Sequence, residues 1–376
     1  MTLFPGLPPA GARMHIGSNP RQNPTQPTVI VTGAAGFIGS HTSQTLINRG
    51  YRVIGIDNFC DFYARSWKEE NLRAVARETG TAGIELEEMD ITDGPRIARL
   101  IQTVKPEGII HLAAMAGVRP SIERPVYYSK VNLEGTTNLL SSAAEAGVRK
   151  FVFASSSSVY GNNPKVPFAE TDDVGEPISP YAATKRAGEL LAHTFWHLYK
   201  MPVSCLRFFT VYGPRQRPDL AIHKFARMIH WGQTLPVYGD GSTSRDYTFI
   251  DDIVAGILAA YDRNAAYRIY NLGGSDPVRL DTLIAGIEKA MGKRANLLRK
   301  PAQPGDVERT YADVTRSREE LDYRPNVRLE EGLARFAQWL KANIHNYRLE
   351  GEPAPRELEL SINPQVRDRA KLRAAG

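Results

Sequence analysis

The sequence has little of several features that define particular protein classes. Its 376 residues include only two cysteines, Cys60 and Cys205, which form neither a CxxC pair nor a disulfide framework. Buried free thiols in a reducing compartment fit this usage, so we expect a cytoplasmic protein. No apolar run approaches the length of about 18 residues that a membrane span needs, so we expect no membrane association. Residues 1–27 lack the continuous apolar segment of a secretory signal and predict a flexible arm.

Strong charge and metal-ligand clusters are also missing. The 47 basic and 41 acidic residues give a net charge of +6, with no basic block or aromatic–basic patch, so we expect no nucleic-acid partner. His193 and His197 stand four residues apart, but an HxxxH pair without a third ligand is a poor zinc site, and we expect no metal. Hydrophobic residues make up 42 % of the chain, which is ordinary for a globular protein with a large core.

What the first half does contain is a regular alternation of short apolar runs and amphipathic stretches. This alternation predicts βαβ units, and therefore an α/β fold with a Rossmann-type, doubly wound parallel sheet. We predict strands at 28–32, 52–56, 84–86, 108–112, 151–155 and 203–207. We predict helices at 38–49, 66–78, 95–104, 130–146 and 181–199.

The pattern changes after about residue 213, where loops become longer and richer in glycine and proline. Helical stretches continue at 220–230, 252–261, 280–290 and 329–342. We therefore predict a dinucleotide-binding domain at 28–212 and a smaller α/β substrate-binding lobe at 213–345, interleaved with the first. Residues 346–376 are charged and aperiodic, which predicts a loose tail.

A glycine-rich loop follows the first predicted strand. Gly33, Gly36 and Gly39 form a GxxGxxG pattern between a strand and a helix, the setting that dinucleotide binding requires. Glycine permits a tight turn and a close approach of backbone N–H groups to a pyrophosphate. Asp57 ends the next strand, where an acid accepts hydrogen bonds from a ribose 2′-OH and repels a 2′-phosphate. This favours NAD over NADP, and a structural turn without a ligand is the alternative.

A second set of residues suits proton and hydride chemistry. Tyr181 and Lys185 are four residues apart on a predicted helix, so their side chains share one face. An ammonium beside a phenol lowers the tyrosine pKa from about 10 toward the working pH, as a general base requires. Serines 155–158 end the fifth strand, at the sheet edge where open α/β folds bind ligands. A Tyr-x-x-x-Lys pair alone occurs by chance, but the three features together predict a catalytic site.

The glycine loop, the serine run with Val159-Tyr160-Gly161, and the Tyr-x-x-x-Lys pair resemble the extended short-chain dehydrogenases/reductases over roughly residues 28–342. Within that family the chain is most similar to nucleotide-sugar epimerases that act on UDP-glucuronate. The resemblance implies tightly bound NAD, a UDP-sugar substrate, a homodimer, and C4 epimerisation through a 4-keto intermediate with hydride transfer to and from NAD. It also implies that Tyr181 is the base, Lys185 its electrostatic partner and ribose ligand, and Ser156 a hydrogen-bond partner of the sugar 4-OH.

The resemblance further implies two sets of binding residues. The cofactor contacts, besides Tyr181 and Lys185, are Gly33, Gly36, Phe37, Ile38, Gly39, Asp57, Asn58, Asp90, Ile91, Leu112, Ala113 and Ala114. Asp90 suits the adenine end, with a surface turn acid as the alternative. The substrate contacts are Arg119, Ser157, Ser158, Thr210, Arg217, Val237, Tyr238, Arg245, Gln303 and Asp306.

Three observations bear on the reaction. Related dehydratases and UDP-glucuronate decarboxylases carry acidic residues near the catalytic serine, whereas this chain has Ser157 and Ser158. Arg217 is expected to grip a C6 carboxylate, because a guanidinium fork matches a carboxylate bidentately. Gln303 departs from the arginine typical of UDP-glucose 4-epimerases. UDP-glucose 4-epimerase, UDP-glucuronate decarboxylase and a catalytically idle NAD-binding regulator are the alternatives.

Overall fold

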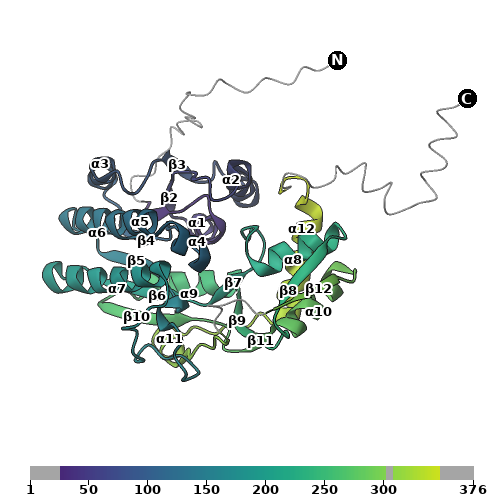
Figure 1. The fold of residues 1–376 in the computed structure, drawn as a ribbon. Helices are drawn as coiled ribbons and strands as arrows, with labels where there is room; N and C mark the ends of the chain where they lie inside the picture. Colours follow the sequence, from purple (N-terminus) through teal and green to yellow (C-terminus); the bar gives the residue numbers. More distant parts are fainter. Residues whose placement is uncertain (1–25, 302–307, 348–376) are drawn as a thin grey trace, which may run out of the picture.

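A seven-stranded parallel sheet forms the centre of the molecule in the computed structural model, which describes residues 26–301 and 308–347 (Figure 1). The strand order is β10-β6-β5-β4-β1-β2-β3. The sheet therefore grows outward in both directions from β1 and β4, and their diverging connections leave a crevice at the carboxyl ends. The strands are β1 (Thr28–Thr32), β2 (Arg52–Asp57), β3 (Glu85–Glu88), β4 (Gly108–His111), β5 (Lys150–Ser156), β6 (Val203–Phe208) and β10 (Tyr267–Leu272).

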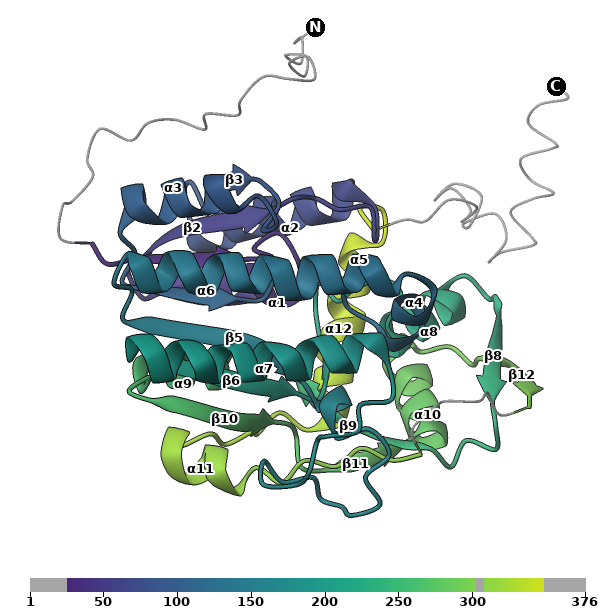
Figure 2. The same ribbon diagram turned by 60° about the vertical axis from the view of Figure 1, so that its left-hand side comes forward.

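Helices cover both faces of this sheet. On one face, α1 (Phe37–Asn48) and α9 (Ile250–Asp262) share a hydrophobic core with the strands, and α2 (Arg65–Thr79) packs beside α1. The other face is covered by α3 (Gly94–Val104), α6 (Gly135–Glu145) and α7 (Pro180–Tyr199) (Figure 2). These helices share a second hydrophobic core with the strands. Because both faces are covered, inner strands such as β1 are buried along nearly their whole length, which explains their apolar runs. The predicted doubly wound α/β fold is confirmed.

Local departures from the predicted elements have physical causes. Strand β3 lies at the sheet edge and carries three glutamates, so little apolar signal marks its end at Glu88 rather than residue 86. The predicted helix at 130–146 begins instead as a π-helical segment, Lys130–Glu134, after α5 (Pro125–Ser129). Short helices α4 (Val118–Glu123) and η2 (Ser157–Tyr160) were not expected; both follow strand ends at the crevice.

The remaining elements build smaller sheets beside the carboxyl edge of the large one (Figure 1). A three-stranded sheet has the order β11-β9-β7, and β12 pairs with β8. The chain leaves and rejoins the main sheet, since α9 and β10 come after β7, β8 and β9. These elements are β7 (Thr210–Tyr212), α8 (Ala221–His230), β8 (Thr234–Tyr238), β9 (Ser244–Phe249), β11 (Pro277–Arg279), α10 (Leu280–Met291), β12 (Asn296–Lys300), α11 (Thr315–Leu321) and α12 (Leu329–Asn343).

No helix within the described residues is both long and apolar enough to cross a bilayer. The predicted arm at 1–27 and tail at 346–376 lie almost entirely outside the described residues, as do Gln303 and Asp306.

Candidate active site

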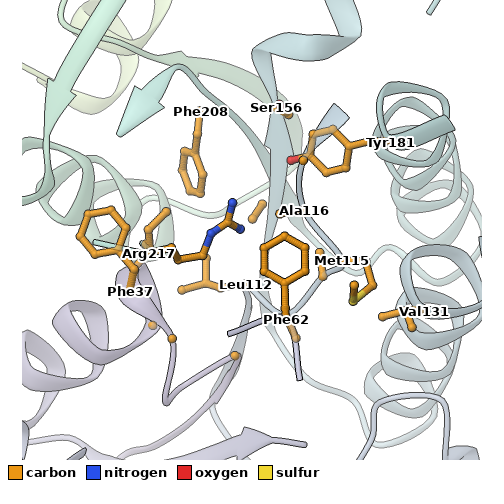
Figure 3. Close-up of a pocket in the computed structure, with 18 of the residues that line it drawn as sticks. Phe37, Phe62, Leu112, Met115, Ala116, Val131, Ser156, Tyr181, Phe208 and Arg217 are labelled. Carbon is orange, nitrogen blue, oxygen red and sulfur yellow. The ribbon is translucent and has the colours of Figure 1, made fainter. Parts of the chain in front are cut away.

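A cavity of about 390 Å³ lies at the carboxyl ends of the central strands (Figure 3). The glycine loop, the ends of β2, β4 and β5, the first turns of α7 and the segment after β6 line it. The predicted residues in its lining are Gly33, Gly36, Phe37, Ile38, Gly39, Asp57, Asn58, Ile91, Leu112, Ala113, Ala114, Ser156, Ser157, Ser158, Tyr181, Lys185, Thr210 and Arg217. Segments from both halves of the sequence therefore meet at one cavity.

The glycine loop has a geometry that side chains would destroy. Gly33 has φ +68°, and a Cβ on Gly39 would lie 2.0 Å from the Gly33 carbonyl oxygen. Gly36 is the N-cap of α1 and supplies no capping side chain, so first-turn N–H groups of α1 remain for a ligand. A helix N-terminus of this kind favours an anion, and the residues present fit a dinucleotide pyrophosphate.

Asp57 lies at the end of β2 and is held by several donors. Its Oδ2 accepts from the Ala35 N–H at 3.2 Å, and its Oδ1 accepts from Phe59 N–H at 2.9 Å. Lys68 Nζ also donates to Oδ1 at 3.2 Å, and both side chains are 6 % exposed. Lys68 lines the cavity but was not predicted, because nothing in the pattern of an amphipathic helix distinguishes one lysine that turns inward. Asp57 and Lys68 together provide hydrogen-bonding groups at the end of β2.

Asp90 does not belong to the cavity lining. Its Oδ1 accepts from the Thr92 N–H and hydroxyl, and its Oδ2 accepts from Asn58 Nδ2 at 2.7 Å. Burial opposes ionisation, but these hydrogen bonds outweigh it and hold the pKa of Asp90 below its usual value. In this structure Asp90 stabilises the turn after β3 and orients Asn58, which does line the cavity.

Tyr181 and Lys185 lie on the first turns of α7, whose N-cap Ser179 accepts a hydrogen bond from Ala182 N–H at 3.1 Å. Lys185 Nζ donates to the Ala154 carbonyl oxygen at 2.8 Å and lies 5.9 Å from the centre of the Tyr181 ring. Burial lowers the pKa of Lys185 to about 7. The lysine therefore bridges α7 to the end of β5, next to the serine run.

Two groups besides the predicted Lys185 bear on the pKa of Tyr181. Burial raises the pKa of Tyr181, and the groups that oppose this rise are the Ser156 hydroxyl and the Arg217 guanidinium. The lowering of the Tyr181 pKa expected from the Lys185 ammonium stays a prediction. Figure 3 shows the Tyr181 hydroxyl turned toward Ser156 and the cavity.

Arg217 reaches into the cavity with its guanidinium held on two sides. Along one edge of the guanidinium, Arg217 Nε donates to Asp219 Oδ1 at 3.1 Å and Arg217 Nη2 donates to Asp219 Oδ2 at 2.9 Å. The ring of Phe62 lies against one face, 5.0 Å from the guanidinium carbon. Figure 3 shows the guanidinium in the middle of the cavity, on the side facing Tyr181. The neighbouring Arg215 points elsewhere and bonds Gln44 at 2.7 Å and Glu78 at 2.9 Å.

The other predicted substrate residues within the described part of the chain do not line this cavity. Val237 is 1 % exposed and packs in a small core with Leu235 and Ile284. Arg245 Nη1 donates to the Ser244 carbonyl oxygen at 2.9 Å. Arg119 and Tyr238 are likewise outside the lining, so the roles given to these four residues stay predictions. Within the part of the chain that the structure describes, no group of three or more His, Cys, Asp or Glu could hold a metal ion.

A buried ionic network behind the cavity was not predicted. Glu189, one turn after Lys185, is fully buried and accepts from Ser155 Oγ at 2.6 Å. Arg207 on β6 is 1 % exposed and binds both oxygens of Glu189 at 2.9 Å. Arg207 also donates to the Tyr160 hydroxyl at 3.0 Å. This network fixes α7 against β5 and β6, and so fixes Tyr181 relative to the serine run.

Comparison with known proteins agrees with this geometry. The family model described as GDP-mannose 4,6 dehydratase matches residues 30–336. A probable UDP-glucuronate 4-epimerase of Rhizobium meliloti is 40 % identical over 333 residues, covering 84 % of this chain and 97 % of that protein. UDP-glucuronate 4-epimerase 3 of Arabidopsis thaliana is 42 % identical over 331 residues, covering 83 % and 76 %. The chain belongs to the extended short-chain dehydrogenases/reductases.

Solved structures of this family of NAD-dependent nucleotide-sugar epimerases and dehydratases are similar along their whole length. UDP-glucuronic acid 4-epimerase from Bacillus cereus, in complex with UDP-glucuronic acid and NAD, has a TM-score of 0.78 at 35 % identity, covering 84 % of this chain and 99 % of that one. UDP-glucose 4-epimerase from Thermotoga maritima, with UDP-glucose, has a TM-score of 0.77 at 33 % identity, with the same coverage. The predicted family and the predicted cofactor, NAD, are confirmed.

Proposed function

We propose that this enzyme interconverts UDP-glucuronate and UDP-galacturonate by epimerisation at C4 of the sugar. The observation that carries the proposal is the guanidinium of Arg217, oriented by Asp219 and Phe62 and directed into the cavity on the side facing Tyr181. The relatives named UDP-glucuronate 4-epimerases, at about 40 % identity, support the same substrate.

The fork of Arg217 suits a carboxylate better than a neutral hydroxymethyl group. Asp219 occupies the Nε edge, so the remaining N–H groups are available to a second carboxylate. Paired N–H···O bonds of this kind are strong and specific in direction. Thr210 and the serines at the end of β5 line the same cavity and add neutral donors.

The lining also opposes the rival reactions. Among the described residues of the lining, Asp57 is the one carboxylate, and it lies at the end of β2 rather than beside the serine run. A dehydratase needs an acid near the sugar to expel a hydroxyl as water. Ser157 and Ser158 occupy that neighbourhood and cannot act as acids of this strength.

The mechanism follows from the groups around Tyr181. Bound NAD, which the glycine loop and Asp57 would hold, supplies the hydride acceptor and donor at C4. Tyr181 removes the proton of the 4-OH, and the Ser156 hydroxyl stabilises the phenolate by a hydrogen bond. The resulting 4-keto sugar rotates within the cavity so that C4 presents its other face. C4 is then reduced on that face, and Tyr181 returns the proton to O4. The cofactor is regenerated in each turnover.

Arg217 also has a protective role in this mechanism. Oxidation at C4 produces a β-keto acid, which loses CO2 most easily when the bond to the carboxylate stands perpendicular to the carbonyl plane. A guanidinium fixed by Asp219 and Phe62 holds the carboxylate in one orientation. Holding it away from the perpendicular suppresses decarboxylation.

The test is product analysis by NMR after incubation of the purified enzyme with UDP-glucuronate, without added NAD. UDP-galacturonate is the expected product, and Tyr181→Phe should abolish its formation. A UDP-pentose as the main product would identify a decarboxylase, and turnover of UDP-glucose alone would identify a UDP-glucose 4-epimerase. Turnover of neither sugar would leave an NAD-binding protein without this activity.

We also propose that the enzyme is a cytoplasmic homodimer. The apolar side chains of Leu190, Leu198 and Tyr199 on α7 are 53 %, 63 % and 57 % exposed to solvent. Their exposure supports packing of α7 against α7 of a second subunit. The free thiols Cys60 and Cys205 support a reducing compartment. Size-exclusion chromatography with light scattering measures the molar mass and so tests for the dimer. Leu190→Lys should lower the measured mass toward that of the monomer.

A further inference from the structure

Tyr347 lies beyond α12 and outside the residues that the family model matches, yet it is buried against the cofactor-binding half. It is 2 % exposed. Its ring packs edge-on against Trp67 of α2, with the ring centres 5.0 Å apart, and against Trp339 of α12 at 4.8 Å. Its hydroxyl donates to Asn71 Oδ1 at 3.0 Å.

Asn71 extends this contact to the glycine loop. Its Nδ2 donates to the Ala35 carbonyl oxygen at 2.9 Å, and Ala35 N–H donates to Asp57 Oδ2 at 3.2 Å. Asn71 is 1 % exposed, so no water can readily replace a lost partner. Buried hydrogen bonds in series are strong, and leaving one member unpaired is costly.

The position of Ala35 makes this connection relevant to the cofactor. Its carbonyl belongs to the peptide that joins it to Gly36, the N-cap of α1. Because a peptide is planar, fixing the carbonyl oxygen fixes the whole unit and the start of the helix. On α2, Trp67 and Asn71 face Tyr347, while the adjacent Lys68 contacts Asp57 within the cavity. A shift of α2 would therefore disturb the cavity at two points, the Ala35–Gly36 peptide and Asp57.

We propose that Tyr347 is a positioning residue for the cofactor loop, acting through Asn71 on the Ala35–Gly36 peptide. The segment that follows α12 thereby contributes to the retention of NAD without touching it. Loss of the Tyr347 hydroxyl weakens the binding of NAD by the glycine loop while leaving the groups around Tyr181 in place.

The experiment compares release of NAD from the full-length holoenzyme and its variants, followed by exchange with isotopically labelled NAD. Tyr347→Phe keeps the ring and removes only the hydroxyl; release is expected to be about 3- to 10-fold faster, the effect of one buried hydrogen bond. The turnover number at saturating NAD should stay within about twofold of the parent. Asn71→Leu should release NAD faster still, and Tyr347→Phe should add nothing in that background.

The matched control is Tyr323→Phe. Tyr323 is also buried, and its hydroxyl donates to the Gly273 carbonyl oxygen at 3.1 Å, at a site outside the cavity lining. Its loss should lower thermal stability without changing NAD release. Equal release rates for Tyr347→Phe and the parent would overturn the proposal. So would equal acceleration by both tyrosine variants, or a Tyr347→Phe effect that persists in the Asn71→Leu background.

Discussion

Replacing Arg217 by glutamine should change which UDP-sugar the enzyme binds. The glutamine retains a hydrogen-bonding group but removes the charge and the fork that face the cavity. Truncating one partner of a desolvated charge pair costs about 2–5 kcal/mol, which corresponds to a loss of roughly 30- to 5,000-fold. Arg217 is 19 % exposed, so the lower part of that range applies, and we expect a 30- to 100-fold weaker binding of UDP-glucuronate. Binding of UDP-glucose, which has no carboxylate, should change less than threefold.

The same substitution should shift the pH dependence of turnover. The Arg217 charge lowers the pKa of Tyr181, which burial otherwise raises. Its removal leaves Tyr181 protonated up to a higher pH, and only the phenolate can accept the 4-OH proton. The rising limb of the kcat profile should therefore move to higher pH in Arg217→Gln. Arg217→Lys keeps the charge without the fork, so it should restore the pH profile but not the selectivity.

Isothermal titration calorimetry with each UDP-sugar measures the change in affinity. Initial rates from pH 6 to 10 measure the shift in the pH profile. A matching loss of affinity for UDP-glucose and UDP-glucuronate would contradict the carboxylate contact. An unchanged pH profile in Arg217→Gln would contradict the electrostatic effect on Tyr181. An increased yield of UDP-pentose from UDP-glucuronate would add support for the protective role of the fork.

Three further predictions concern the cofactor loop, the buried network and acid stability. Gly39→Ala should purify without bound NAD, seen as a loss of cofactor absorbance, because its Cβ would lie 2.0 Å from the Gly33 carbonyl oxygen. Glu189→Gln should lower the free energy of unfolding in urea by about 3–5 kcal/mol, because it leaves the buried Arg207 without its counter-charge; a loss below 1 kcal/mol would refute this. Burial lowers the pKa of His111 and His223 to about 3. The unfolded chain therefore binds more protons below about pH 6.5, and stability should fall with decreasing pH by roughly 1.4 kcal/mol per unit for each histidine; a flat profile between pH 6.5 and 4 would count against it.

The sequence predicts best where one local pattern determines the structure. Strand β1 was predicted with the bounds that the structure has, because a buried central strand is a continuous apolar run ended by a glycine loop. Helix α7 was predicted to within one residue, since a long amphipathic stretch marks it clearly. The edge strand β3 was displaced, because exposed glutamates give a weak strand signal.

Side chains that act in pairs from distant segments were not predictable. Lys68, Phe62 and Asp219 look like ordinary residues in a helix and two loops, and their importance appears only when Asp57 and Arg217 are placed beside them. The influence of Arg217 on the pKa of Tyr181 was missed for the same reason, because the sequence shows only the neighbour on the same helix, Lys185. Pairwise electrostatics require distances, and a single sequence supplies distances only within one helix or strand.

These distant pairs have a common consequence for selectivity. Phe62 comes from the segment after β2, whereas Arg217 and Asp219 come from the segment after β7, so the orientation of the fork depends on how the two halves of the molecule are aligned. Trp67 of α2 takes part in this alignment. Its ring contacts Tyr347 and also stacks on His223 of α8, with ring centres 5.5 Å apart. A displacement of α2 would therefore alter the cofactor loop and the contact between Phe62 and Arg217 together. It follows that Trp67→Ala, unlike Tyr347→Phe, should both accelerate NAD release and reduce the preference for UDP-glucuronate over UDP-glucose; a change in only one of the two properties would show that the loop and the fork are positioned independently.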